Sequence, residues 1–142
     1  LDLKRLQLSP GNVVSAYAPQ DIQKELAKCQ RYYWKSFKQG TAVAQNAGTP
    51  NALGYICQTA GVKLWGRTVA FPMTMRDTPN VVTYNPSAAD ANWRNTTLGA
   101  NSGVPSISLL DTNNVVINNP QVAGDAAGNV ISIHATANAR LS

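Results

Sequence analysis

Charged side chains are scarce in this sequence. Asp, Glu, Lys and Arg make up 13% of the 142 residues, against a usual share of about 25%. Since hydrophobic residues account for 44%, Asn, Ser, Thr, Gln and Gly must cover most of the surface, which is therefore neutral and hydrogen-bonding. The length allows one domain that buries roughly two-thirds of its unfolded surface, but not two ordinary domains.

Long hydrophobic runs are also missing. No apolar stretch approaches the roughly 18 residues of a membrane span, and no secretory signal is recognisable, so neither membrane insertion nor secretion is expected. The sequence opens at Leu1 without a methionine, which indicates a cut end. We expect residues 1–18 to be the end of an upstream module, with a short strand over 1–8, followed by a linker.

Residues that bind metals or act as nucleophiles are few. His134 is the single histidine, and Cys29 and Cys57 are the two cysteines, so no zinc-binding spacing exists and no cofactor is expected. A Cys29 nucleophile would depend on His134 as its base, with no signature around either residue. Two buried thiols are the preferred interpretation, and one disulfide bridge stays open as an alternative.

Motifs of nucleotide and sugar chemistry give little support for an enzyme. Neither Gly-rich phosphate loop occurs. A carboxylate pair for glycan cleavage would have to come from residues such as Asp77, Asp90 and Asp125. Asp77 and Asp125 lie in turn-like sequence, which favours structural roles. We expect no catalytic residue.

Short strands and turns dominate from residue 40 onward. Asn, Gly and Pro separate runs rich in β-branched and aromatic residues. This spacing predicts a mainly β fold, an antiparallel jelly-roll-like β-sandwich over 40–142. The predicted strands are 53–59, 62–71, 80–85, 104–110, 114–117 and 129–141.

The last predicted strand alternates in character. Ile131, Ile133, Ala135 and Ala137 share one face, and the other face carries Ser132, His134, Thr136 and Asn138. The pattern predicts a strand whose polar face is exposed to solvent.

One α-helix is predicted over 19–39, running to about Phe37. Pro19 and Asp21 suit a helix start. Five residues form a narrow apolar stripe that we expect to serve assembly: Ile22, Leu26, Cys29, Tyr33 and Phe37. The basic residues of the same segment are Lys24, Lys28, Arg31, Lys35 and Lys38. They lie mostly off the stripe, so nucleic-acid binding stays a minor alternative.

A polar segment over 86–103 surrounds Trp93 and is the candidate ligand site. An exposed aromatic ring beside amides and hydroxyls suits a sugar. The candidate glycan-binding residues are Trp93, Asn92, Arg94, Asn95, Asp90, Tyr84 and Asn85. The alternative is that Trp93 packs inward and anchors the loop.

Two blocks of sequence resemble a known family. "ELAKCQRYY" and "FPMTMRDTPNVVTYN", with "RLQLSPG" before them and "IHATANARL" after, are similar to the C-terminal domain of many bacteriophage tail fibres, tailspikes and related virion proteins. The matching residues, for which structural roles are expected, are Glu25, Leu26, Cys29, Gln30, Arg31, Tyr32, Tyr33, Phe71, Pro72, Met75, Arg76 and Pro79.

The resemblance implies a location, an assembly state and a function. It implies a virion protein made in the host cytoplasm, homotrimeric and non-catalytic, that ends a fibre, assists its assembly and can contact a host cell-surface glycan. One alternative is a purely structural virion component or trimerisation cap without a ligand. A glycan depolymerase is the weaker alternative.

Overall fold

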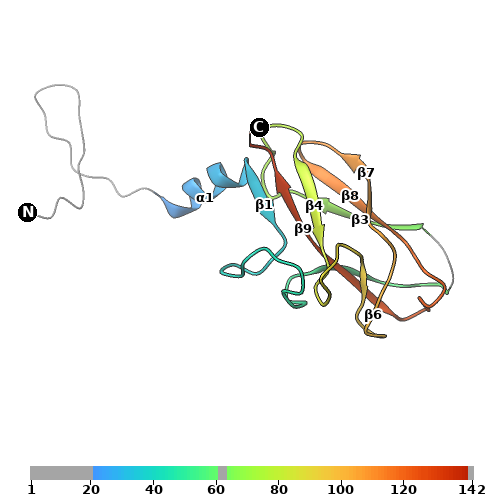
Figure 1. The fold of residues 1–142 in the computed structure, drawn as a ribbon. Coiled ribbons are helices and arrows are strands. Elements are labelled where there is room, and N and C mark those ends of the chain that lie inside the picture. The colour runs from blue at the N-terminus through green and yellow to red at the C-terminus, as the bar shows by residue number, and fades with distance from the viewer. Residues whose placement is uncertain (1–20, 61–63, 141–142) are drawn as a thin grey trace, which may run out of the picture.

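The computed structural model describes residues 21–60 and 64–140 (Figure 1). The expected strand and linker within 1–18 lie outside the described residues. The elements are α1 (Ile22–Gln30), β1 (Tyr33–Lys35), β2 (Leu53–Ile56), β3 (Leu64–Ala70), β4 (Asn80–Tyr84), β5 (Arg94–Asn95), β6 (Ala100–Asn101), β7 (Ser106–Leu110), β8 (Asn114–Pro120) and β9 (Val130–Asn138).

The C-terminal strand β9 is the centre of the larger sheet. Its first half pairs with β2 and β5, and its second half pairs with β1 and β4, always antiparallel. The short strand β6 extends the sheet beyond β5. Because nine consecutive residues of β9 hold four other strands, this one strand organises the sheet.

The second sheet contains β3, β8 and β7 in that order, also antiparallel. Strands β3 and β8 pair without interruption from Leu64 opposite Pro120 to Ala70 opposite Asn114. The pairing of β7 with β8 shifts register between Ile107 and Leu109, which is the signature of a β-bulge.

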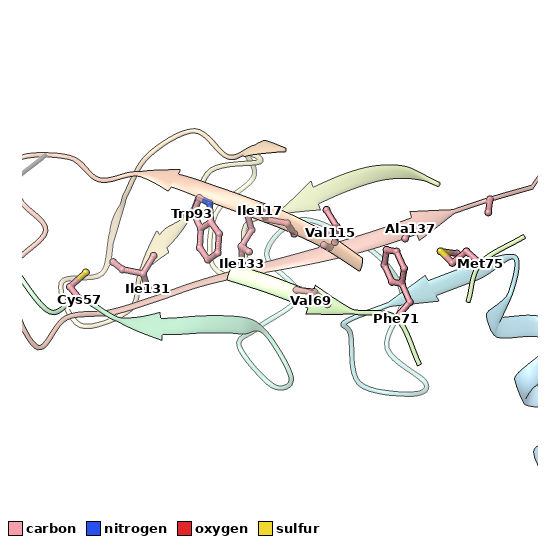
Figure 2. Close-up of a cluster of buried hydrophobic side chains, with 12 residues drawn as sticks. Cys57, Val69, Phe71, Met75, Trp93, Val115, Ile117, Ile131, Ile133 and Ala137 are labelled. Atoms are coloured by element: carbon pink, nitrogen blue, oxygen red, sulfur yellow. The ribbon is translucent and has the colours of Figure 1, made fainter. Parts of the chain in front are cut away.

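The hydrophobic core lies between the two sheets (Figure 2). The apolar face of β9 meets Val115 and Ile117 of β8 and Val69 of β3, while Trp93 fills the space beside them. The buried core residues are Cys57, Val69, Phe71, Met75, Trp93, Val115, Ile117, Ile131, Ile133, Ala135, Ala137 and Ala139. The expected mainly β sandwich of antiparallel sheets, preceded by one helix, is therefore confirmed.

The sequence-based prediction for β9 was only half right. Its apolar residues face the core as expected, and all four are fully buried. The opposite face was expected to be exposed, yet Ser132, His134 and Thr136 are also buried. Residues that follow β1 cover part of this face: Ser36 contacts the imidazole of His134 through a hydrogen bond, and Phe37 through ring stacking.

The helix is shorter than predicted. It ends at Gln30, and Tyr33–Lys35 forms strand β1 instead of continuing the helix to Phe37. The reason is pairing with β9, which places Trp34 opposite Ala137. Adjacent aromatic residues favour strands, and a free sheet edge gives them backbone partners that a helix extended into solvent would not offer.

Candidate functional site

Helix α1 begins at a well-formed cap. The Asp21 carboxylate accepts a hydrogen bond from the backbone N–H of Gln23 at 2.9 Å, which satisfies one of the free donors of the first turn. Glu25 lies in that first turn and forms a 2.7 Å ion pair with Lys28 in the last turn. Acidic groups near the start and a basic group near the end both suit the helix dipole.

Although it is well capped, α1 buries none of its residues. Ile22 is 79% exposed and Leu26 47% exposed, the opposite of what an amphipathic helix packed on its own domain shows. Figure 1 shows the helix projecting from the two sheets beside β1. A helix of nine residues is only marginally stable on its own in water. Since none of its residues is buried, its apolar stripe lacks a full partner in the described chain.

A groove of about 650 Å³ lies where α1 meets β1. One wall is the helix itself, through Leu26, Cys29 and Gln30, and aromatic side chains form much of the rest. The complete lining is Leu26, Cys29, Gln30, Tyr32, Tyr33, Trp34, Lys35, Phe37, Gln39 and Arg140. Such a concave apolar surface with a few polar groups is suited to receiving another side chain or segment.

Cations lie over the tyrosine rings at this groove. The guanidinium of Arg140 is 5.7 Å from the centre of the Tyr33 ring, and that of Arg76 is 5.6 Å from the Tyr32 ring. Burial raises the pKa of Tyr33, aided by Tyr84, while Arg140 partly opposes the change. Both tyrosines therefore present amphipathic rings beside fixed positive charge.

The groove rests on a polar cluster centred on His134. Phe37 stacks on the imidazole, whose Nδ1 lies 2.9 Å from Ser36 Oγ and whose Nε2 lies 2.9 Å from the Gly48 carbonyl oxygen. A carbonyl can only accept, so Nε2 carries the proton and Nδ1 accepts from the Ser36 hydroxyl. Burial lowers the pKa of His134, with partial opposition from the bond to Gly48.

The predicted assembly residues come together differently from the prediction. Tyr33 and Phe37 are not on the helix, so the single helical stripe of five residues was wrong. Nevertheless Leu26, Cys29, Tyr33 and Phe37 all line the groove. Ile22 lies outside the lining, on the projecting helix.

The predicted glycan platform does not exist in the fold. Trp93 has 0% exposed surface, and its indole N–H donates to the Asn118 carbonyl at 2.9 Å. Asn85 and Asn95 are also buried. The ring therefore anchors the 86–103 segment from inside, which confirms the alternative interpretation of Trp93. The physical reason is that the space between two sheets accepts a large apolar ring.

Asp90 is the centre of a hydrogen-bonded cluster that contains several of the other candidate glycan residues. Its carboxylate accepts from the side chains of Asn85 at 2.9 Å and Asn101 at 2.6 Å, and from the Asn92 backbone N–H at 2.9 Å. Arg94 reaches the same Asn101. Desolvation would raise the pKa of Asp90, but these hydrogen bonds outweigh it and lower the pKa.

Sequence reasoning missed a buried polar network around Asp125. The carboxylate is 1% exposed and accepts hydrogen bonds from Asn95 Nδ2 at 2.8 Å, from Ser102 Oγ and from the Val122 N–H. Asn119 joins the network by donating to Ser102 and to the Tyr55 hydroxyl. The turn-like sequence around Asp125 did predict a structural role, but gave no sign of burial.

The groups considered for catalysis are separated or occupied. Cys29 and Cys57 are not joined by a disulfide, and Cys29 is exposed, so the expectation of two buried cysteines holds for Cys57 alone. Both ring nitrogens of His134 are engaged by Ser36 and Gly48. Within 21–60 and 64–140, no cluster of three or more His, Cys, Asp or Glu side chains is arranged to hold a metal ion.

Comparisons with known proteins do not place this chain in a family. No family model, curated protein or solved structure matches it. Among the described residues, no helix is long and apolar enough to cross a membrane.

Proposed function

We propose that this chain is a non-catalytic assembly domain of a bacteriophage tail fibre, tailspike or related virion protein, and that three copies associate through α1 and the adjacent groove. The observation that carries the proposal is the projecting helix that buries none of its own residues. The "ELAKCQRYY" block, which supplies the resemblance to virion proteins, covers most of this helix and the first residue of β1.

The helix favours a second copy of the same chain as the occupant. Ile22, Leu26 and Cys29 are spaced four and three residues apart, as in the repeat along which parallel helices pack. Asp21 and Glu25 are exposed or half-exposed near the helix start, whereas Lys35 and Arg140 line the groove. One chain thus supplies both the apolar stripe and a groove with complementary charge.

Glycan recognition is not retained in this proposal. It depended on an exposed Trp93, and that side chain is fully buried. The function proposed here is therefore the alternative without a ligand: a structural virion domain that holds copies of the chain together. A domain of few charges and tightly bonded turns suits that role, because buried hydrogen-bond networks such as the one around Asp125 make local opening costly.

The first measurement is the solution mass of the chain by light scattering, at low and high salt. We expect a mass of about three chains that is insensitive to salt, because the contact is mainly apolar. Leu26→Asp should convert the assembly to single chains at the same concentration, since it places a charge in the groove wall.

Lys24→Asp is the matched control. Like Leu26→Asp, it introduces an aspartate on helix α1, but at an exposed position opposite the apolar stripe. The solution mass of the assembly should therefore stay the same. A monomeric parent chain at all concentrations would refute the assembly function. Equal effects of the two variants would show that helix stability, rather than the stripe, controls the mass.

A further inference from the structure

Cys57 and Gln121 form an unusual contact inside the domain. Cys57 is the first residue after β2, and Gln121 is the first residue after β8. Both are 1% exposed, and Gln121 Nε2 lies 2.7 Å from Cys57 Sγ. This distance is at the short limit even for an oxygen acceptor, although sulfur is the larger atom. The thiol and the amide are therefore pressed together.

The same amide has an unsatisfied oxygen. Gln121 Oε1 is buried and has no hydrogen-bond partner among the described residues. A buried amide oxygen without a donor is destabilising, because it has lost its hydrogen bonds to water and gained none in the protein. The amide carbon is bonded to Nε2 at about 1.3 Å, so it lies no more than about 4 Å from the sulfur, close to the separation of reacting atoms.

We propose that Cys57 and Gln121 join in an intramolecular thioester. The Sγ–Cδ bond forms as the Cδ–Nε2 bond breaks, and the nitrogen leaves as ammonia with the proton of the thiol. No electrons are gained or lost, so no oxidant or cofactor is needed. A thioester carbonyl is a weaker hydrogen-bond acceptor than an amide carbonyl, so the product also suits an oxygen that lacks a donor.

The surroundings favour the bond once it has formed. Burial of both residues excludes the water that would hydrolyse it. Burial also raises the pKa of the Cys57 thiol, and the Asp125 carboxylate raises it further.

The cross-link would connect the two sheets covalently. Cys57 follows a strand of the β9 sheet and Gln121 follows the central strand of the other sheet. Figure 2 places Cys57 at the end of the core away from the helix. The bond would therefore clamp the end of the sandwich opposite the groove.

The test is the intact mass of the purified full chain, kept free of amine buffers. We expect a mass lower than that of the sequence by one ammonia. Methylamine added to the unfolded chain should open the thioester, raise the mass by one methylamine and expose a second thiol to maleimide. Tandem mass spectrometry should place the methylamine on Gln121.

Three variants separate this bond from other losses of ammonia, such as cyclisation at one of the many Asn residues. Cys57→Ala and Gln121→Glu should restore the full sequence mass after allowing for the substitution. Gln58→Glu, an exposed glutamine beside Cys57, should keep the deficit. A parent chain of full mass with two alkylatable thiols, or a deficit that persists in Cys57→Ala, would overturn the thioester.

Discussion

Phe37 lies flat against the imidazole of His134, with ring centroids 4.2 Å apart and planes inclined by 14°. The same Phe37 lines the groove beside α1. The pair joins the candidate assembly surface to the central strand β9.

Acidification is expected to destabilise the domain through His134. Burial lowers the folded-state pKa below the ordinary value of 6.5, so the unfolded chain takes up the proton first as the pH falls. Stability is complete above this value and decreases below it, by at most about 1.4 kcal/mol per pH unit. Urea unfolding between about pH 8 and pH 5 measures the slope.

The control for this pH dependence is His134→Gln, which keeps an acceptor and a donor but does not titrate. It should be less stable at neutral pH, yet its stability should change little over the same range. Since His134 is the single histidine, an unchanged slope in the variant would contradict the assignment.

Removing the Trp93 ring should destabilise the core severely. Trp93→Ala should lower the free energy of unfolding by about 3–5 kcal/mol because a large cavity forms. Trp93→Phe should lose less, but leaves the Asn118 carbonyl without its donor. Denaturant unfolding measures both. Leu98→Ala, at a 54% exposed side chain, should change stability by less than about 0.5 kcal/mol.

Gly103 is expected to tolerate no side chain. A Cβ there would lie 1.9 Å from the Pro120 carbonyl oxygen and 2.6 Å from Asn119 Oδ1. Gly103→Ala should therefore cost about 3 kcal/mol or more by forcing the backbone apart. Gly124→Ala is the comparison, because a Cβ there meets nothing within 4 Å. Similar thermal midpoints for the two variants would argue against the close packing of these segments.

Asp125→Asn should weaken the buried polar network. The carboxylate accepts from three donors, whereas an amide has one acceptor oxygen and would direct its own N–H groups at a donor. We expect a loss of about 3 kcal/mol in unfolding free energy. Asp77→Asn alters an exposed carboxylate that bonds the Thr78 N–H and should have little effect. Chemical denaturation of both variants decides the point.

Much of the β architecture was readable from local pattern. The alternating apolar face of residues 131–137, and the Asn and Gly breaks between short runs, predicted strands that the structure contains, with ends that differ by a few residues. Such features depend on near neighbours in the chain, since strand propensity and turn chemistry are properties of a few consecutive residues.

The candidate site was only partly readable. Leu26 and Cys29 were correctly placed on a helix, but Tyr33 and Phe37 reach the groove from β1 and the segment after it. Local propensity could not reveal that the edge of β9 competes for Tyr33–Lys35, because the pairing partner lies about a hundred residues away in the sequence.

Sequence by itself determined the fold class, the turns and the start of the helix, because each follows from short-range patterns of polarity and capping. Only the tertiary structure decided which polar residues are buried. Trp93, His134 and Asp125 occur in polar stretches, yet all three are enclosed. Burial depends on what packs against a residue from distant parts of the chain, and no local pattern contains that information.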